Sequence, residues 1–393
     1  MFEGHPIAEI LKRWSEELPG SRWHVVGGAV RDALLGRALG DIDILVAGVE
    51  PVALAKFLEA RGSVDFVGRT FGVFKFTPND GSASLDIALP RREKPAGTGG
   101  YRDVATHADP HMPIEDDLAR RDFTVNAMAW HVVRERRATG EAAGGTLIDP
   151  YGGQEDIAKK ILRAVGDPTM RFQEDYTRML RALRFAIQLD FGIEAATWNA
   201  LRASMTHVNE TRHGGRLVPY ELVSRELVKS LEAAPIRASE LWTDAGAVEA
   251  LLPALGGGWP LAVRRAMARL KEEDVLRTLS GKSVPSRVRV GMCFAHLGRD
   301  GAMALAERLR LASSGHGVDA TLLRRLASGV DVALYKELGA ESLLSGETVM
   351  KLLKLEPGPS VGEALDLLID AQARGKVSGP GEAEDYLKKR FGA

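Results

Sequence analysis

The sequence predicts an α+β protein, with a small mixed sheet near the amino terminus and an all-helical remainder. Through residues 20–165, short apolar runs of strand length alternate with helical stretches, and the first run stops at the turn formers Gly27 and Gly28. From about Glu174 onward, apolar residues recur at helical spacing and strand-like alternation disappears. Glycine and proline divide the rest of the chain into amphipathic segments, which is typical of a helical body.

The same patterns predict the individual elements. We expect strands over residues 23–26, 42–46, 73–76 and 84–88, and helices over residues 29–35 and 51–60, with Pro51 in the first turn of the second helix. Residues 91–113 are polar and include Gly97-Thr98-Gly99-Gly100, so we expect an exposed connector there. These elements predict a head over residues 1–165, a helical neck over 166–255, and a helical body and tail over 256–393.

Composition narrows the class of protein. The chain has 393 residues, of which 45% are hydrophobic, enough for two or three domains. The one cysteine, Cys293, excludes an internal disulfide and argues against a zinc site built on thiolates, so we expect a reducing, cytoplasmic setting. Residues 1–14 have no continuous apolar stretch, and no apolar run of about 18 residues could span a bilayer, so we expect a soluble protein.

Charge alone does not decide whether the partner is a nucleic acid. The formal net charge of -1 argues weakly against one, because phosphate neutralisation dominates the affinity of such proteins. Basic residues do crowd one stretch and the carboxyl terminus: Arg264, Arg265, Arg269, Lys271, Arg277, Lys282, Arg287 and Arg289, then Lys388, Lys389 and Arg390. Solvated helix faces would explain this pattern equally well.

Two acidic residues, Asp41 and Asp43, are the centre of the functional hypothesis. On a strand, side chains at i and i+2 share a face, where two carboxylates repel each other unless a cation lies between them. Mg²⁺ prefers such oxygen ligands, and phosphoryl transfer uses it to align the reacting oxygens. An isolated pair of this kind is more often an ordinary exposed turn. Here it follows Gly27, Gly28, Arg31 and Asp32, a turn suited to binding a triphosphate through backbone N–H groups and a guanidinium.

A third carboxylate, Asp86, lies on another predicted strand. It could take the proton of an attacking hydroxyl, or it could be a metal ligand. An ordinary aspartate at the edge of a strand is the remaining interpretation.

Together, these residues resemble the nucleotidyltransferase head of the DNA polymerase beta superfamily, and more closely the bacterial (class II) CCA-adding enzymes and their poly(A) polymerase relatives. Three further motifs follow in the family's order: RRDFTVNA at residues 120–127, DPYGGQEDI at 149–157 and EDYTRMLRALRF at 174–185. The resemblance is strong over residues 20–195 and weaker to the end. It implies a polymerase-beta-like head with a small mixed sheet, followed by a helical neck, body and tail.

The resemblance also implies roles for individual residues. Arg121 would bind a triphosphate, while Asp122 and Asn126 could hydrogen-bond ribose hydroxyls. Asp175 and Arg178 are three apart, which places them on one face if both are helical, and in the family this pair selects CTP and ATP by their base edges. Arg181 and Arg184 continue the face and would contact the nucleotide. Surface ion pairs at this spacing would be the structural alternative.

The implied activity is addition of C, C and A to the 3′ end of tRNA, from CTP and ATP, with Mg²⁺ as cofactor and pyrophosphate as product. In the family, the segment at Gly97-Thr98-Gly99-Gly100 is a mobile element needed for the final A. Poly(A) polymerase, or a partial enzyme that adds only CC or only A, stays a close alternative, and a small-molecule nucleotidyltransferase or an inactive binding module is a more distant one. Around His296 we see no His-Asp pair of the hydrolase-bearing branch and expect no hydrolase activity. The oligomeric state stays open.

Overall fold

The computed structural model describes residues 2, 4–66, 72–81, 83–95, 97–100, 103–132, 145–212, 214–271, 283–311, 318, 322–323, 326, 342–373 and 376–392. The chain divides into two compact units, Met1–Val218 and Pro219–Ala393. This division lies between the boundaries at 165 and 255 that the sequence suggested, and the three-part division stays a prediction.

The first unit is built on a seven-stranded sheet with the order β3-β4-β5-β2-β1-β8-β9. Its strands are β1 (Arg22–Val26), β2 (Asp43–Ala47), β3 (Gly62–Phe66), β4 (Val73–Pro78), β5 (Leu85–Ala88), β8 (Ala129–His131) and β9 (Thr146–Ile148). The sheet is mixed, because β2 and β5 run parallel whereas β1 is antiparallel to both β2 and β8. The predicted small mixed sheet is therefore confirmed, with β3, β8 and β9 in addition to the four expected strands.

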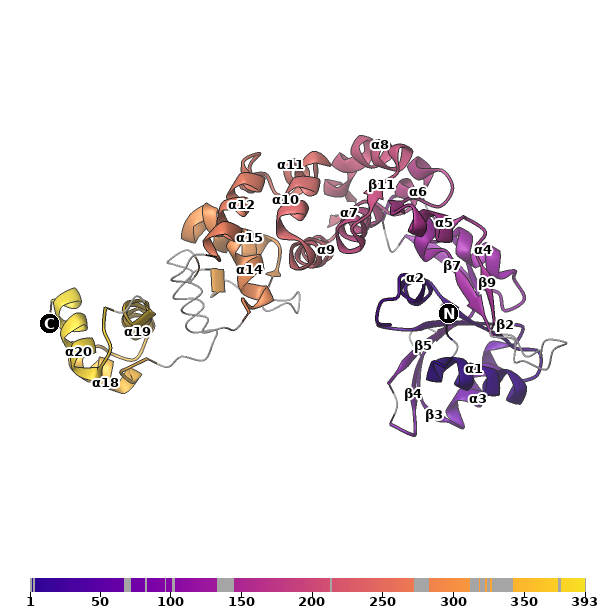
Figure 1. Ribbon diagram of the computed structural model, residues 1–393, viewed down its shortest axis with the longest axis horizontal. Coiled ribbons are helices and arrows are strands. Elements are labelled where there is room, and N and C mark those ends of the chain that lie inside the picture. Colours follow the sequence, from indigo (N-terminus) through magenta and orange to yellow (C-terminus); the bar gives the residue numbers. More distant parts are fainter. Residues whose placement is uncertain are drawn as a thin grey trace. The chain divides into compact units, whose positions relative to one another are not determined.

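Helices cover both faces of this sheet. On one face lie α1 (Pro6–Glu17) and α3 (Pro51–Glu59) (Figure 1). Trp14 of α1 packs there against Trp23 of β1, Phe57 of α3 and Phe76 of β4. On the other, Leu118 of α4 (Ile114–Ala119) belongs to a core cluster with residues of β1, β2 and β8. Burial of both faces holds the ends of the central strands in place.

A two-stranded hairpin, β6 (Arg91–Pro95) and β7 (Val104–Ala108), pairs outside the main sheet. The expectation of a connector over residues 91–113 was therefore wrong, since this segment forms a hairpin and leads into α4. The reason is physical: both faces of the ribbon carry polar side chains, so the alternation of apolar residues that marks a strand is missing.

Short helices complete the first unit. They are α2 (Gly28–Leu34), η1 (Thr124–Asn126), α5 (Gly153–Ala158), α6 (Pro168–Glu174), α7 (Thr177–Leu189), α8 (Ala195–Ser204) and η2 (Met205–Asn209), with two-residue pairs β10–β11 (Ile161–Leu162, Gly192–Ile193) and β12–β13 (Thr211–Arg212, Gly215–Arg216). Asp167 caps α6 by accepting from Met170 N, with Pro168 at the first position. The break between α6 and α7 falls at Asp175 and Tyr176, inside the segment expected to be one helix.

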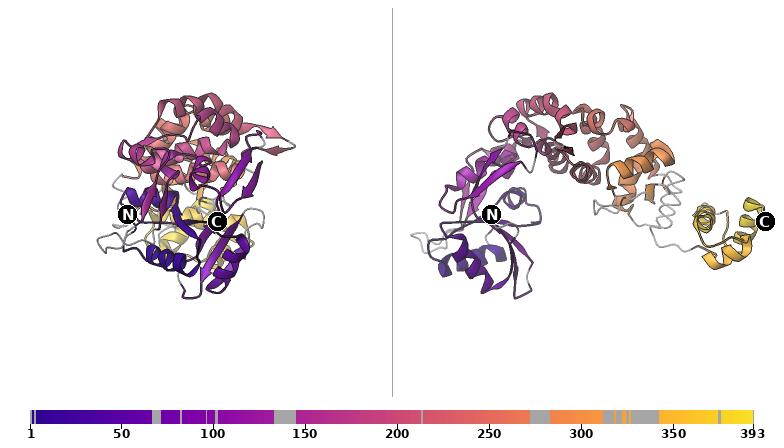
Figure 2. Two further views of the ribbon diagram at one scale, coloured as in Figure 1. Left: turned by 90° about the vertical axis from the view of Figure 1, so that its right-hand side faces the viewer. Right: turned by 180° about the vertical axis from the view of Figure 1, so that it is seen from behind.

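The second unit is helical throughout its described part. Its elements are α9 (Tyr220–Ala233), α10 (Pro235–Asp244), α11 (Ala247–Leu251), η3 (Pro253–Leu255), α12 (Trp259–Arg269), α14 (Ser286–Met292), η4 (Ala295–Leu297), α15 (Gly298–Arg308), α18 (Gly346–Leu353), α19 (Pro359–Ala373) and α20 (Pro380–Phe391). The last three helices pack against one another (Figure 2). They share a core cluster that includes Val349, Leu368 and Leu387. Of the basic stretch, Arg277 and Lys282 lie outside the described residues. Among the helices that the structure describes, none combines the length and apolar character needed to span a bilayer.

Candidate active site

A pocket of about 570 Å³ in the first unit collects most of the residues that the sequence singled out. The sheet and the α6–α7 segment both contribute to its walls. The expected residues that line it are Gly27, Gly28, Arg31, Asp43, Asp86, Arg121, Asp122, Asn126, Asp175, Arg178 and Arg181. Segments that are far apart in the sequence therefore meet at one place, although the motif at 149–157 does not line the pocket.

Three expected residues do not line this pocket. Asp41 lies in a bend before β2, which begins only at Asp43, so the argument that both share one strand face was wrong. Asp32 forms an ion pair with Arg31. Arg184 is buried, and its guanidinium carbon lies 3.9 Å from the centre of the Phe185 ring. It does not line the pocket because the helical period turns it away from the pocket face.

The carboxylates of Asp43 and Asp86 lie on neighbouring parallel strands at paired positions. Desolvation in the pocket raises the pKa of Asp43; the positive charge of Arg121 opposes this, while Asp86 and then Asp41 raise the pKa further. Within the described part of the chain, none of these three side chains has a hydrogen bond or an ion pair. A cluster of carboxylates that the charge of Arg121 offsets only in part is an environment in which a divalent cation is stabilising.

These carboxylates are the hard oxygen ligands that a divalent cation prefers. The described residues contain no group of three His, Cys, Asp or Glu side chains arranged to hold a metal ion. Such a cation can bind through one or two carboxylates and complete its shell with water and substrate phosphates. The pocket presents two carboxylates for this mode of binding, those of Asp43 and Asp86.

The half-buried guanidinium of Arg121 is held loosely. Its buried Nε has no hydrogen-bond partner among the described residues, and its other contacts are long, at 3.4 Å to the Asn126 carbonyl oxygen and 3.5 Å to Asp117 Oδ2. It passes so close to Gly27 that a Cβ there would lie 2.6 Å from Arg121 Nη1. The N–H of Gly27 donates to the Met128 carbonyl, so this group is already used within the protein. Gly27 thus makes room for an arginine whose donors are available to an anion.

A chain of hydrogen bonds links α2 to α7 beneath the pocket. Arg31 pairs with Asp32 and donates to Asn126 Oδ1 over 2.7 Å. Asn126 Nδ2 donates to Asp122 Oδ1, and Arg181 donates twice to Asp122 Oδ2, over 2.9 and 2.6 Å. Burial alone would raise the pKa of Asp122, but Arg181 and the Asn126 amide lower it to about 2. The side chains expected to contact ribose and triphosphate therefore also orient one another.

Asp175 and Arg178 do not share a helix. Asp175 follows the end of α6, and its carboxylate accepts from the N–H and hydroxyl of Thr177, over 2.8 and 2.6 Å, at the start of α7. Burial raises the pKa of Asp175, although Thr177 and Arg178 act in the opposite direction. Arg178 pairs with Glu174 instead. Both side chains still line the same pocket, although a different local structure places them there.

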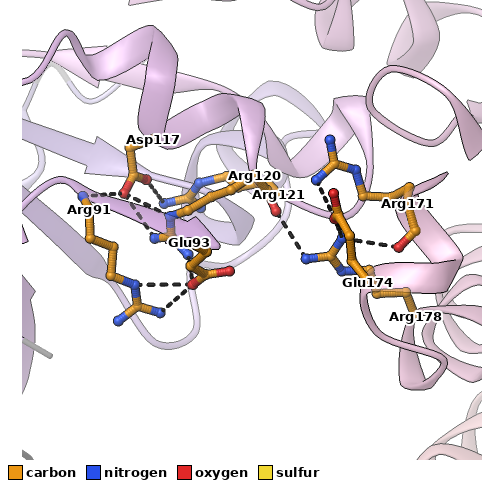
Figure 3. Close-up of polar contacts among 8 residues, drawn as sticks. All are labelled: Arg91, Glu93, Asp117, Arg120, Arg121, Arg171, Glu174 and Arg178. Atoms are coloured by element: carbon orange, nitrogen blue, oxygen red, sulfur yellow. Dashed lines mark hydrogen bonds and ion pairs between the residues drawn. The ribbon is translucent and has the colours of Figure 1, made fainter. Parts of the chain in front are cut away.

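The pocket also includes residues that the sequence did not single out as site residues, namely Arg91, Glu93, Arg120 and Phe185. Glu93 lies between two guanidinium groups, 3.2 Å from Arg91 and 2.6 Å from Arg120 (Figure 3). The i, i+2 spacing of Arg91 and Glu93 was the available signal, because it places both on one face of a strand. The strand itself had to be recognised first.

The amino-terminal part of the chain is similar in sequence to known nucleotidyltransferases. Residues 23–163 match the poly(A) polymerase head domain. The multifunctional CCA protein of Dechloromonas aromatica (strain RCB) is 41% identical over 232 residues, which are 58% of this chain and 49% of that protein. That of Paracidovorax citrulli (strain AAC00-1) is 41% identical over 243 residues, 61% of this chain and 52% of that protein. The head of this chain is therefore similar to the poly(A) polymerase head domain, and its amino-terminal part to multifunctional CCA proteins.

Solved CCA-adding enzymes share the fold of the chain beyond the head. The enzyme of Bacillus stearothermophilus in complex with CTP is 23% identical and has a TM-score of 0.51, covering 99% of this chain and 97% of that one. The Thermotoga maritima enzyme complexed with tRNA is 22% identical with a TM-score of 0.58, covering 98% of this chain and 95% of that one. The chain spans about half the length of the multifunctional CCA proteins that it matches.

Proposed function

We propose that this chain is a nucleotidyltransferase that adds C, C and A to the 3′ end of tRNA, without a nucleic-acid template, from CTP and ATP. One observation carries the proposal: a single pocket is lined both by Asp43 and Asp86 from the sheet and by Asp175 and Arg178 from the α6–α7 segment. Groups suited to metal binding and groups suited to base selection thus lie within the reach of one nucleotide. The kinship of the head with CCA-adding enzymes supports the same activity.

In the proposed reaction, the terminal 3′-oxygen of the tRNA attacks the α-phosphorus of the nucleotide. A bond forms between that oxygen and phosphorus, and the bond to the departing pyrophosphate breaks. A divalent cation, which we propose to be Mg²⁺, neutralises phosphate charge when it is bound. Asp43 would hold the cation, with Asp41 adding negative charge from the adjacent bend. Asp86 would complete the metal site or accept the proton of the hydroxyl.

The remaining pocket residues would bind and choose the nucleotide. Arg121, whose donors are poorly used within the protein, would bind the triphosphate. The carboxylate of Asp175 can accept a hydrogen bond from an exocyclic amine, and Arg178 can donate to a ring nitrogen or carbonyl. Cytosine and adenine offer an amine at this edge, whereas uracil and guanine place a carbonyl there. A mismatch leaves buried polar groups unpaired and costs on the order of 1–3 kcal/mol.

The helical second unit would supply the contacts to RNA. Its basic residues Arg264, Arg265 and Arg287 are candidates for phosphate contacts, which dominate affinity for nucleic acids. A small-molecule nucleotidyltransferase would not need so large a helical part.

Single-nucleotide assays test the proposal. Transcripts of tRNA ending before, within and after the CC sequence are incubated with one labelled nucleotide at a time. We expect addition of C, then C, then A, followed by arrest. Long tracts of A would identify a poly(A) polymerase, and failure to add A after CC would identify a CC-adding enzyme. Absence of any incorporation with Mg²⁺ present would refute nucleotidyl transfer.

A further inference from the structure

Arg171 of α6 lies beside the pocket but does not line it, and each of its side-chain nitrogens has a partner. Its Nε donates to the Val165 carbonyl over 3.1 Å, Nη1 to Glu174 Oε2 over 2.8 Å, and Nη2 to the Ala119 carbonyl over 2.9 Å. The side chain is 13% exposed. An arginine committed in three directions fixes the relative positions of the three segments that it contacts.

Glu174 connects Arg171 with Arg178, the base-selecting arginine of the proposed function. One oxygen, Oε2, accepts from both guanidinium groups (Figure 3). Arg178 Nη1 also donates to the backbone carbonyl of Arg171 over 3.1 Å, and Nη2 donates to the carbonyl of Arg120 over 3.1 Å. The direction in which Arg178 presents its remaining N–H groups is therefore set by Glu174 and by two backbone oxygens.

The two arginines hold consecutive carbonyls at the end of α4. Arg171 donates a hydrogen bond to the carbonyl of Ala119, and Arg178 donates one to the carbonyl of Arg120. The next residue in the chain is Arg121. Carbonyls at the end of a helix have no partner inside it and carry a partial negative charge, so cations are stabilising there. This arrangement connects the segment that places Arg121 with the segment that places Arg178.

We propose that Arg171 is a positioning residue for nucleotide selection, which acts through Glu174 to hold Arg178 in register with the segment of Arg121. The inference rests on the proposed function, in which Arg178 contacts the base. Without Arg171, Arg178 keeps its charge and its place on α7, but Glu174 and the end of α4 lose a shared anchor. Discrimination between bases, which depends on direction, is lost before attraction of the triphosphate, which depends on charge.

The test measures nucleotide discrimination in matched variants. Arg171→Gln removes the charge and most of the directed donors, Arg171→Lys keeps only a single charged point, and Glu174→Gln weakens the link from the other side. Arg13→Gln is the control, since Arg13 is an exposed arginine of α1 with one ion pair. Calorimetry measures the dissociation constants of CTP and UTP. Single-turnover experiments measure the rates of C and U incorporation on a tRNA that ends before CC. Thermal unfolding measures the stability of each variant.

We expect the preference for CTP over UTP to fall about ten- to a hundredfold in Arg171→Gln and in Glu174→Gln, corresponding to one charge-assisted hydrogen bond. Arg171→Lys should reduce this preference nearly as much. The double variant Arg171→Gln/Glu174→Gln should reduce it no more than either single variant does, and Arg13→Gln should leave it unchanged. A preference that is unchanged in folded Arg171→Gln and Arg171→Lys, or an equal loss for both nucleotides, would overturn the inference. A wild-type chain that binds CTP over UTP but incorporates neither would contradict the proposed activity alone, since the effect of Arg171 on the binding preference is still measured.

Discussion

Replacing Gly27 with alanine tests whether Arg121 binds an anion in the pocket. Gly27 has φ 70° and ψ -129°, a conformation that alanine adopts only at a cost of about 1–3 kcal/mol. A Cβ there would lie 2.6 Å from Arg121 Nη1, so the guanidinium must move, and its long hydrogen bonds do little to resist this. Loss of one charge-assisted hydrogen bond to a phosphate costs about 1.5–3 kcal/mol, so kcat/KM for CTP should fall roughly ten- to a hundredfold.

Gly36→Ala provides the matched control for this experiment. Gly36 also has a positive φ, of 65°, but an added Cβ would meet nothing within 4 Å. Both variants therefore carry backbone strain, on the order of 1 kcal/mol or more, which urea unfolding measures. Steady-state kinetics with CTP and a tRNA transcript should then separate them, with Gly27→Ala impaired and Gly36→Ala close to wild type. Equal kcat/KM in the two variants would refute the role given to Arg121.

Three other predictions use the same kinds of measurement. Asp43→Asn should abolish nucleotide incorporation without lowering the melting temperature. The pKa of Asp43 is raised, so its ionised form destabilises the fold at neutral pH, and the neutral amide removes this penalty. Wild-type rates in this variant would exclude Asp43 as a metal ligand. Gly99→Ala should disturb nucleotide selection, because the added Cβ would lie 2.1 Å from the ring of Tyr176. Gly97→Ala is the control, since its Cβ would meet nothing within 4 Å. Equal nucleotide selectivity in the two variants would count against docking of this loop on Tyr176. Burial lowers the pKa of His24 to about 3, so as the pH falls below 6.5 this histidine takes up a proton in the unfolded chain before it does so in the folded one. The free energy of unfolding should therefore fall by up to about 1.4 kcal/mol per pH unit down to about pH 4. His24→Leu should flatten this slope in urea titrations, and an unaltered slope would show that other groups cause it.

Local patterns were enough to predict the central strands and the acidic residues at their ends. The segments now seen as β1 and β2 are apolar runs beside turn-forming residues, and this is the signal that a buried strand leaves in a sequence. The pairing of Asp43 with Asp86 could not be predicted in this way. Parallel strands are joined by a long crossover, here through β3 and β4, so no tight turn fixes their register.

The proposed base-selecting pair, Asp175 and Arg178, illustrates how a wrong local structure can still place two side chains in one pocket. The i, i+3 spacing of Asp175 and Arg178 suggested one helical face, but an aspartate can also hydrogen-bond the backbone two residues on, as Asp175 does with Thr177. Asp175 is the carboxyl-terminal cap residue of α6, and α7 begins two residues later at Thr177. Spacing alone does not distinguish the two arrangements, because both bring the side chains to the same side of the chain.

Under the proposed function, the charges of the pocket favour a metal-bound triphosphate over either component alone. The pKa of Asp43 is raised by desolvation and by its acidic neighbours, so the ionised carboxylates destabilise the empty pocket. Arg121 also lines this pocket; in the part of the chain that the structure describes, its buried Nε has no partner and its ion pair with Asp117 is long, at 3.5 Å, so the charge of this cation is incompletely compensated. A cation alone relieves only the first of these penalties, and an anion alone relieves only the second while adding repulsion beside Asp43. A ligand that carries both charges relieves them together, so its two parts should bind cooperatively, with an affinity for CTP that rises steeply with the concentration of divalent cation.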